Sequence, residues 1–144
     1  MEPELRALVI ARLRQVDQRL TAKREAVVDA LALASRPITI AEILNARPGL
    51  AQSSVYRNLV VLEQAGIAHR IVTDGEYGRF ELAEDLTGHH HHLICARCGA
   101  VEDVPASAGL ERSVEHAAAQ ISADTGFRTQ AHRLDLVGLC RDCS

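Results

Sequence analysis

The four cysteines of the chain form two Cys-x-x-Cys pairs, Cys95 with Cys98 and Cys140 with Cys143. Each pair can present two thiolates to one ion from a tight turn, and four thiolates complete the tetrahedral shell of a closed structural zinc site. The pairs are separated by 41 residues, 99–139, whereas a simple zinc ribbon separates them by roughly 15 to 20. The chain between the pairs must therefore fold into a unit of its own and return to where it began.

This intervening segment has the pattern of a strand, a helix and a second strand. "GAVEDV" (99–104) and "HRLDLVGL" (132–139) are the predicted strands. The helix between them has one apolar face, made by Leu110, Val114, Ala118 and Ile121. Zinc at the cysteines would fasten the last strand to the first, so we expect this half of the chain to unfold when the ion is removed.

The composition predicts a globular protein of the cytoplasm. Hydrophobic residues make up 47% of the 144 residues, which is enough for one domain or two small ones. No apolar stretch approaches the roughly 20 residues of a membrane-spanning helix, and acids stand at the start of the chain, where a secretory signal would be basic. We therefore expect no membrane partner, and in a reducing compartment paired cysteines favour a metal over disulfides.

The net charge of −3 hides an uneven distribution. Residues 1–70 carry ten Lys and Arg against seven Asp and Glu, a balance of +3, whereas residues 71–144 carry six against twelve, a balance of −6. All four cysteines and six of the seven histidines lie in the acidic half. This division favours a first half that meets a polyanion and a second half that holds cations.

The first half begins with the pattern of two amphipathic helices. Apolar residues at helical spacing place one face of the first helix at Leu5, Leu8, Val9, Leu13, Val16 and Leu20. Thr21 can cap a second helix, which ends before Pro37. The buried stripe of this second helix would be Val27, Ala30, Leu31 and Ala34.

Two further helices and a hairpin follow. "TIAE" (39–42) has the spacing of a capping box and opens a short third helix. A fourth helix runs from about Gln52 to Ala65, and Gly66 is placed to end it. "IAHRIV" and "YGRFEL" then form two strands around the turn "TDGE" (73–76). Helices followed by a two-stranded ribbon are typical of a winged helix-turn-helix domain.

In a winged helix-turn-helix domain the last helix before the hairpin enters the major groove of DNA. Its outward residues near the N-terminus would be Ser53, Ser54, Tyr56 and Arg57. Arg57 could bind guanine with both arms of its guanidinium, and Tyr56 could contact a thymine methyl group or a phosphate. Phosphate contacts beside the second helix would come from Arg19, Lys23 and Arg24. Double-stranded DNA is thus the predicted partner, the alternative being ordinary solvated side chains.

Four consecutive histidines, residues 89–92, lead into the first cysteine pair. The run is predicted to be extended, and successive side chains of a strand point to opposite faces. His89 and His91 would then face one way and His90 and His92 the other, so that one run supplies two separate metal sites. A solvated histidine run, or a remnant of cloning, is the alternative.

Each histidine pair needs further ligands. His69 and Glu81 lie on the two arms of the predicted hairpin, close to the junction between the halves. Glu111 lies on the predicted helix of the second half, and His132 begins its last strand. Taken singly, each of these residues could also be an ordinary surface or strand-end residue.

Five stretches of the sequence, in this order, resemble the ferric uptake regulator family of metal-dependent bacterial transcription factors. They are "RLTAKREAVVDAL" (19–31), "SSVYRNLVVLEQAGI" (53–67), "RFEL" (79–82), "HHHHLICARCG" (89–99) and "HRLDLVGLCRDC" (132–143). The resemblance covers nearly the whole chain. It implies an α+β protein with an N-terminal winged helix-turn-helix domain, a hinge and a small α/β dimerisation domain whose zinc site is made by four cysteines. On this sequence these parts are residues 1–83, 84–88 and 89–144.

The resemblance also implies three sets of metal ligands. The structural zinc ligands of the family fall on Cys95, Cys98, Cys140 and Cys143. Its regulatory hinge site falls on Glu81, His90 and His92, with His69 in place of an acidic ligand of zinc-sensing relatives. Its second site falls on His89, His91, Glu111 and His132, the same division that strand alternation predicts. Asp103 stands where some peroxide-sensing relatives have a ligand.

Two departures from the family pattern bear on the regulatory metal. Pro37 stands where iron-sensing members often have a histidine ligand, and the hinge lacks the cysteine of many zinc sensors. Nitrogen and oxygen ligands accept Zn²⁺, Fe²⁺, Mn²⁺ or Ni²⁺. The histidine run slightly favours zinc as the regulatory ion.

The function that the resemblance implies is that of a metal-responsive transcriptional repressor that controls metal homeostasis, not an enzyme. It would bind palindromic operators as a metal-loaded homodimer. One alternative is a peroxide sensor in which a metal-binding histidine is oxidised. The other is a zinc-dependent hydrolytic enzyme, which is disfavoured because the His-x-Glu and Pro-Cys-x-x-Cys motifs of deaminases are missing and aromatic residues make up only 3% of the chain.

Overall fold

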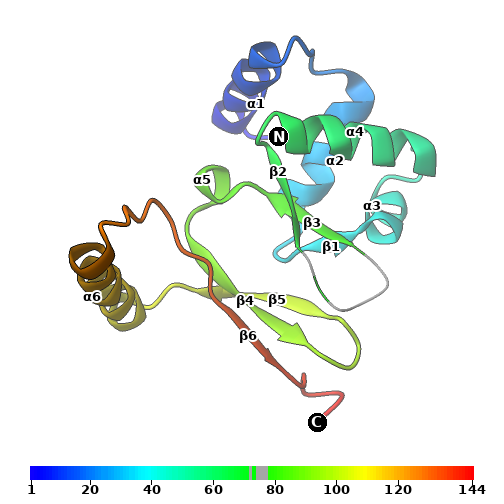
Figure 1. The fold of residues 1–144 in the computed structure, drawn as a ribbon. Helices are drawn as coiled ribbons and strands as arrows, with labels where there is room; N and C mark the ends of the chain where they lie inside the picture. Colours follow the sequence, from blue (N-terminus) through cyan, green and yellow to red (C-terminus); the bar gives the residue numbers. More distant parts are fainter. Residues whose placement is uncertain (72, 74–77) are drawn as a thin grey trace.

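The structure, a computed structural model, describes residues 1–71, 73 and 78–144. It has two parts, with a short helix between them (Figure 1). The first part contains α1 (Pro3–Gln15), α2 (Ala22–Leu33), β1 (Ile38–Thr39), α3 (Ile40–Ala46), α4 (Gln52–Gln64), β2 (Ala68–Ile71) and β3 (Arg79–Leu82). The second contains β4 (His90–Cys95), β5 (Val101–Pro105), α6 (Ala108–Thr125) and β6 (Asp135–Gly138), and α5 (Glu84–Thr87) lies between the parts. The α+β class predicted from the sequence is confirmed, and the predicted elements follow one another in the predicted order, with β1 and α5 in addition.

The predicted caps of α2 and α3 are present, but α1 ends at Gln15, so that Val16 and Leu20 of its predicted face lie beyond it, and Ala34 is the residue after α2. The Thr21 hydroxyl accepts a hydrogen bond from the Arg24 amide at 3.3 Å and caps α2. The Thr39 hydroxyl accepts from the Glu42 amide at 3.2 Å, and the Glu42 carboxylate accepts from the Thr39 amide at 2.8 Å. This is the predicted capping box of α3. Gly66 follows α4 with a φ of 67°, a conformation that favours glycine.

The apolar faces of these helices meet over the first sheet. The side chains that they bury include Val9, Leu13, Val27, Leu31, Ile43, Val55, Leu59 and Leu62, and the sheet adds Phe80 and Leu82. Burying each side chain of this kind contributes roughly 1.5–3 kcal/mol relative to leaving it exposed. Leu8 departs from the predicted inner face of α1, because it is 48% exposed.

The first sheet has three antiparallel strands in the order β1-β3-β2. The predicted hairpin is present as β2 and β3, which pair from Ala68 with Leu82 to Ile71 with Arg79. The predicted turn at 73–76 lies outside the described residues except for Thr73. The sequence did not predict β1, which has only two residues and exists through its pairing with β3.

The second sheet has the order β5-β4-β6, so that the histidine run lies on its central strand. β5 pairs with β4 in the antiparallel direction and β6 pairs with it in parallel. Both strands lie within the segments predicted for them, apart from the last residue of β5. The parallel pairing, with Cys95 opposite Gly138, brings the second cysteine pair back to the first.

α6 lies to one side of the second sheet (Figure 1). In α6, all of which is described, no residue is buried, and Ile121 is 52% exposed. The expected burial of its apolar face is therefore not found within one chain, because α6 does not lie over the sheet. The described helices, including α6, are too short or too polar to cross a membrane.

Polar contacts join the two parts. The predicted hinge contains α5, and Arg12 of α1 forms a salt bridge with Asp85 of α5 and donates a hydrogen bond to the carbonyl of Gly66. Arg79 of β3 donates to the carbonyl of Gly99 at 2.8 Å. Since Gly99 follows the first cysteine pair, this bond ties the first sheet (β1-β3-β2), which we call the winged sheet, to the turn that carries Cys98.

We expect the substitution Thr39→Ala to lower the free energy of unfolding by about 1 kcal/mol, because the first turn of α3 loses its side-chain cap. Denaturant unfolding of the full chain measures this loss. Thr129→Ala, at an exposed residue between α6 and β6, is the matched control and should leave stability unchanged. Equal stability of the two variants would contradict the prediction.

Candidate metal centres and DNA-binding surface

The four cysteines lie together at one end of the second sheet. Their sulfur atoms all lie within 4.8 Å of one another, and Cys98 Sγ is 3.8 Å from Cys140 Sγ. The backbone amides of Cys98 and Cys140 donate to Cys95 Sγ at 3.5 and 3.4 Å. Four sulfurs from two turns match the donor set of a closed tetrahedral zinc site.

The protonation of these thiols shows why the group fits a cation. The two amide donors lower the pKa of Cys95 to about 6. At Cys143 the hydrogen bond with Cys140, together with burial, raises the pKa to about 12. Cys95 and Cys143 can therefore both be thiolates at neutral pH only if a positive charge lies among the sulfur atoms.

β4 sends neighbouring histidines to opposite faces of the sheet, as the alternation of a strand requires. His90 and His92 lie in a cluster with Glu81 and Asp103, which we call the hinge cluster. His89, which precedes β4, and His91 lie in another cluster with Glu111 and His132, which we call the second cluster. In each cluster one ligand atom per residue lies within 4.8 Å of all the others.

The hinge cluster joins the two parts of the molecule. Glu81 comes from β3 of the winged sheet, and its carboxylate oxygens lie 3.0 Å from His90 Nε2 and 3.0 Å from His92 Nε2. Asp103 comes from β5, opposite His92 in the register of the second sheet. Its Oδ1 lies 3.8 Å from His90 Nε2 and 3.7 Å from His92 Nε2. Two imidazoles and two carboxylates form a donor set suited to a divalent ion.

The charges of the hinge cluster depend on one another. Burial alone would raise the pKa of Glu81, but the hydrogen bonds from His92 and His90 outweigh it and leave this pKa lowered. Hydrogen bonding to Glu81 raises the pKa of His92. Burial opposes the rise in pKa at His90, where bonds to the Gly88 carbonyl and to Glu81 prevail. Burial raises the pKa of Asp103. Protons thus compete with a metal for these donors.

His69 is not in the hinge cluster of the structure. It stands opposite Glu81 in the register of the winged sheet and lines a cavity of about 290 Å³ together with Glu81, His90 and His92. Asp103 instead supplies the fourth group of the cluster. His69 is therefore a neighbour of the candidate site, and its role as a ligand stays a prediction.

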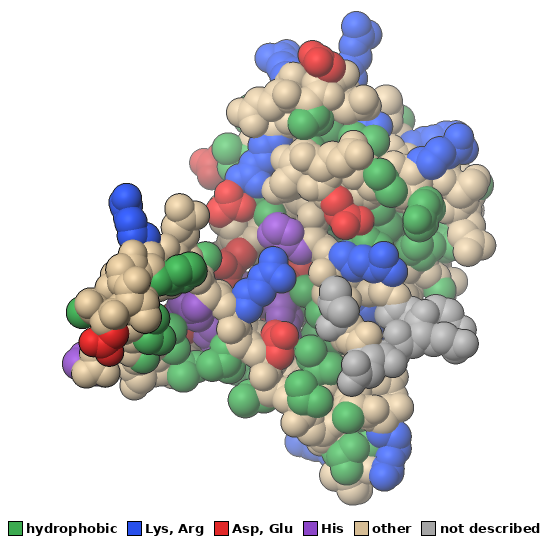
Figure 2. Space-filling model, in the orientation of Figure 1, with side chains coloured by type: hydrophobic (Ala, Val, Ile, Leu, Met, Phe, Trp, Pro, Cys, Tyr) green, Lys and Arg blue, Asp and Glu red, His purple; other side chains and the backbone are tan. Residues whose placement is uncertain are grey.

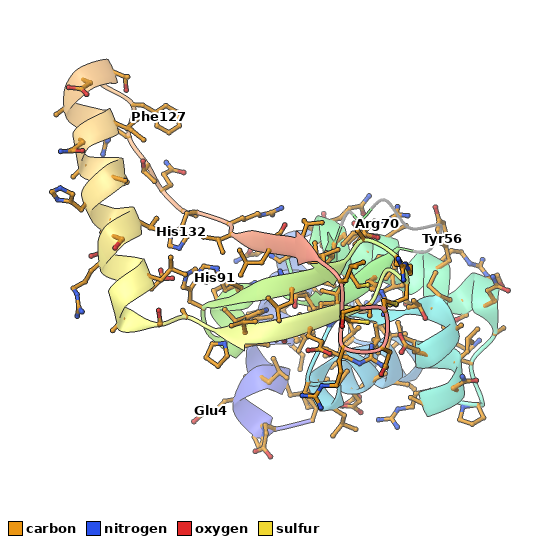
Figure 3. The ribbon with its side chains drawn as sticks, turned by 90° about the horizontal axis from the view of Figure 1, so that it is seen from below. Glu4, Tyr56, Arg70, His91, Phe127 and His132 are labelled. Carbon is orange, nitrogen blue, oxygen red and sulfur yellow. The ribbon has the colours of Figure 1, made fainter. Side chains whose placement is uncertain are left out.

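The second cluster places three imidazoles around one carboxylate (Figure 3 labels His91 and His132). Oε2 of Glu111 lies 3.0 Å from His89 Nε2 and 2.9 Å from His132 Nε2, and Oε1 lies 2.6 Å from His91 Nε2. His91 is 3% exposed, and its Nδ1 is buried without a partner among the described residues. Because Glu111 lies in the first turn of α6, this cluster ties α6 to β4.

The surface predicted to bind DNA is present only in part. Ser53, Tyr56 and Arg57 are exposed on α4, and Arg19 and Lys23 are exposed near the start of α2. Figure 2 shows Lys and Arg side chains projecting from the helical part and histidines where the two parts meet.

Two residues predicted to reach DNA are buried instead. Arg24 is 8% exposed, donates to Asn58 Oδ1 at 3.1 Å and also bonds the carbonyl of Arg19. Ser54 is 9% exposed, and its carbonyl accepts from Asn58 Nδ2 at 2.8 Å. The outward placement expected of Ser54 and the free side chain expected of Arg24 are therefore not found, since Arg24 is held by Asn58 across the contact between α2 and α4 and Ser54 is bonded to Asn58 within α4. Their contacts with DNA stay predictions.

Sequence reasoning missed two acids that contact the histidines from outside the clusters. Glu84 of α5 bonds Nδ1 of His89, and Asp135 Oδ1 of β6 lies 3.4 Å from His92 Nδ1. Their closeness in the sequence to predicted ligands was the only signal, and it does not show which way a carboxylate points.

Comparison with known proteins agrees with this arrangement. A peroxide operon regulator of Bacillus subtilis (strain 168) is 31% identical over 136 residues, which cover 92% of this chain and 88% of that protein. The peroxide-responsive repressor PerR of Staphylococcus aureus (strain USA300) is 30% identical over 140 residues, which cover 93% of this chain and 88% of that protein.

Among solved structures, the ferric uptake regulator (Fur) of Vibrio cholerae matches with a TM-score of 0.71 and 25% identity. The match covers 90% of this chain and 98% of that one. The family model described as the ferric uptake regulator family matches residues 15–137. The chain belongs to the ferric uptake regulator family.

Proposed function

We propose that this protein is a metal-responsive transcriptional repressor that acts in the cytoplasm and binds palindromic operator DNA as a homodimer. The observation that carries the proposal is the hinge cluster, in which Glu81 of the winged sheet meets His90, His92 and Asp103 of the second sheet. A ligand that binds all four residues must favour one arrangement of the two parts over the others. Such a ligand therefore controls how α4 is presented to DNA.

The switch acts as a shift between arrangements of the winged-helix part. A divalent ion at the hinge cluster would supply bonds that Glu81, His90 and His92 share. Glu81 then holds β3, and α4 with it, at a fixed place relative to β4. Because DNA prefers the same arrangement, metal and DNA strengthen each other's binding by the same factor.

The winged-helix part would meet DNA through α4. Tyr56 is 58% exposed, and with Ser53 and Arg57 it forms the outward surface near the start of this helix. A homodimer would present two such helices to successive major grooves, which explains why a palindrome is the expected operator. Exposed apolar side chains in the second part offer a surface for the second copy, and they include Ile121, Phe127, Leu136, Val137 and Leu139.

The proposed cofactors are structural zinc at the cysteines and a regulatory divalent ion at the histidines. The four sulfurs favour Zn²⁺. The hinge cluster offers nitrogen and oxygen donors, which accept Zn²⁺, Fe²⁺, Mn²⁺ or Ni²⁺. The second cluster, with three imidazoles and one carboxylate, is the proposed second site for such an ion. His69 would join the hinge site only if its side chain moved toward Glu81.

Peroxide sensing is a second candidate function. Two relatives at 30–31% identity are a peroxide operon regulator and a peroxide-responsive repressor. Asp103 in the hinge cluster occupies the position that the sequence resemblance associates with peroxide-sensing relatives. Under this hypothesis Fe²⁺ at the hinge cluster would let hydrogen peroxide oxidise a neighbouring imidazole and so end repression.

The proposed function makes a prediction about the hinge cluster. The wild-type protein should bind a duplex selected from a random pool more tightly with metal, by roughly 5–150-fold for a typical allosteric coupling. His90→Ala should lose most of this gain, because Glu81 keeps only His92 and Asp103 as partners in the cluster. The measurement is a DNA-binding titration with Zn²⁺, Fe²⁺ and Mn²⁺ in turn.

His116→Ala, at an exposed histidine of α6, is the control and should keep the full response. Circular dichroism checks that both variants fold. A normal metal response of His90→Ala would show that the hinge cluster is not the regulatory site.

The second prediction concerns the cysteines. Structural zinc contributes on the order of 10 kcal/mol, which is comparable to the total stability of a typical domain. Strong chelation should therefore unfold the second part, while the first part keeps its own core. Backbone NMR of the full chain would show loss of dispersed signals from residues 89–144, and added Zn²⁺ should restore them. Retention of these signals after the zinc is lost would contradict a structural role.

The third prediction separates peroxide sensing from metal sensing. The tryptic peptide 80–97 carries the four histidines of the run. After exposure of the Fe²⁺-loaded protein to hydrogen peroxide, it should gain the mass of one oxygen atom if the protein senses peroxide. The Zn²⁺-loaded protein is the control and should gain none. An unchanged peptide in the iron form would rule against the peroxide hypothesis.

A further inference from the structure

We propose that Glu84 is a positioning residue of the second cluster: its carboxylate holds the His89 ring so that Nε2 faces the cluster. The proposal rests on the proposed function, because it treats the second cluster as a metal site. Glu84 is not among the residues of either cluster. It lies in α5, in the hinge between the two parts.

The geometry places the two nitrogens of His89 in different roles. Nδ1 is hydrogen-bonded to Glu84 Oε1. Nε2, on the far side of the ring, lies 3.0 Å from Glu111 Oε2 and 3.0 Å from His132 Nε2. Glu84 therefore contacts the side of the imidazole that points away from the candidate ion.

A neutral imidazole carries one N–H, and its other nitrogen has the lone pair that binds a metal. With Nδ1–H donating to Glu84, the lone pair lies on Nε2 and points into the cluster. Histidine ligands commonly donate their second nitrogen to a carboxylate or carbonyl in this way, which fixes the tautomer and strengthens the ligand. His89 needs such a partner because it precedes β4 and is not held by the strand.

Glu84 is itself held in place. Its Oε1 also accepts from the backbone amide of His90 at 3.2 Å. One oxygen of α5 thus joins the first residue of β4 and the ring of the residue before it. Asp85, the next residue of α5, pairs with Arg12 of α1, so α5 is fixed from both sides.

The hinge cluster repeats this arrangement with different residues. His92 Nδ1 lies 3.4 Å from Asp135 Oδ1, and His90 Nδ1 lies 2.9 Å from the carbonyl of Gly88. Their Nε2 atoms face Glu81. Asp135 therefore provides an internal comparison: it contacts a histidine of the hinge cluster, whereas the side-chain contact of Glu84 is with a histidine of the second cluster.

The experiment measures Co²⁺ affinity at each cluster separately, by competition with a chelator. Mild chelation should empty the histidine clusters of the full-length protein and leave zinc at its cysteines, which metal analysis checks before each titration. The Co²⁺ affinity of the second cluster is measured in the variant His92→Ala, which lacks a ligand of the hinge cluster. The affinity of the hinge cluster is measured in His91→Ala, which lacks a ligand of the second cluster. Glu84→Ala should weaken Co²⁺ binding at the second cluster by about 10–100-fold, the usual effect of removing such a partner.

Three further variants test whether the effect is specific. Glu84→Gln keeps an acceptor oxygen and should lose less affinity than Glu84→Ala. Asp135→Asn should weaken the hinge cluster and spare the second cluster. Glu102→Gln, at an exposed acid of β5 outside both clusters, should change neither. Zinc content and circular dichroism confirm that each variant folds.

Nitrogen-15 NMR of the imidazoles gives a readout that a merely structural role would not move. In the Zn²⁺-loaded protein, where the ion would take the lone pair of His89 Nε2, the Nδ1 proton beside Glu84 should exchange slowly enough to be observed, and in Glu84→Ala it should exchange too fast to be seen. An unchanged proton signal, unchanged second-cluster affinity, or equal losses at both clusters would overturn the role of Glu84 and leave the proposed repressor function intact. If the variant His92→Ala, which still carries Glu84, binds no Co²⁺ at the second cluster, the role proposed for Glu84 is wrong. The proposed repressor function is tested separately, by the DNA-binding titration.

Discussion

The pleat of β4 fixes where the metal-binding side chains of the second part can lie. Because β4 pairs with β5 on one side and β6 on the other, its register is held twice. A register shift of β4 by one residue would turn every side chain to the opposite face of the sheet. His91 would then lie on the face of the hinge cluster, and His90 and His92 on the face of the second cluster. Two candidate metal sites can therefore share one run of four histidines only as long as both neighbouring strands stay in register. The parallel pairing with β6 also brings the cysteine pairs together, which links the candidate zinc site to this register.

Local and periodic features of the fold could be predicted from the sequence. The caps at Thr21 and Thr39 depend on residues three positions apart, and the alternation of the histidines depends only on the period of a strand. The Cys-x-x-Cys pairs report a long-range contact directly, since four thiolates need a shared ion. In each of these features the interacting residues can be recognised from the sequence motif alone.

Features that depend on tertiary packing could not be predicted in this way. Arg24 looks like an exposed cation, but it is buried in the contact between α2 and α4, where its guanidinium donates to Asn58. Asp103 rather than His69 completes the hinge cluster because β5 places it beside His92. The apolar face of α6 was visible in the sequence, yet its periodicity does not say whether the same chain or a second copy covers it. In each case the deciding partner comes from a distant segment.

The way the two parts meet explains why a few ligands could control the whole molecule. The hydrophobic core of the first part comes from residues 1–86, and the second part buries Ile94, Cys95 and Val101 separately. The contacts between them named above are polar. An exposed pair such as Arg12 with Asp85 contributes roughly 0–1 kcal/mol, and the part-buried bond from Arg79 to the carbonyl of Gly99 roughly 1.5–3 kcal/mol. A shift from 1:99 to 99:1 between two arrangements requires about 5.5 kcal/mol. Ligand bonds shared by Glu81 and the two histidines can supply free energy on this scale, whereas a continuous apolar interface would have fixed one arrangement and left nothing for a metal to regulate.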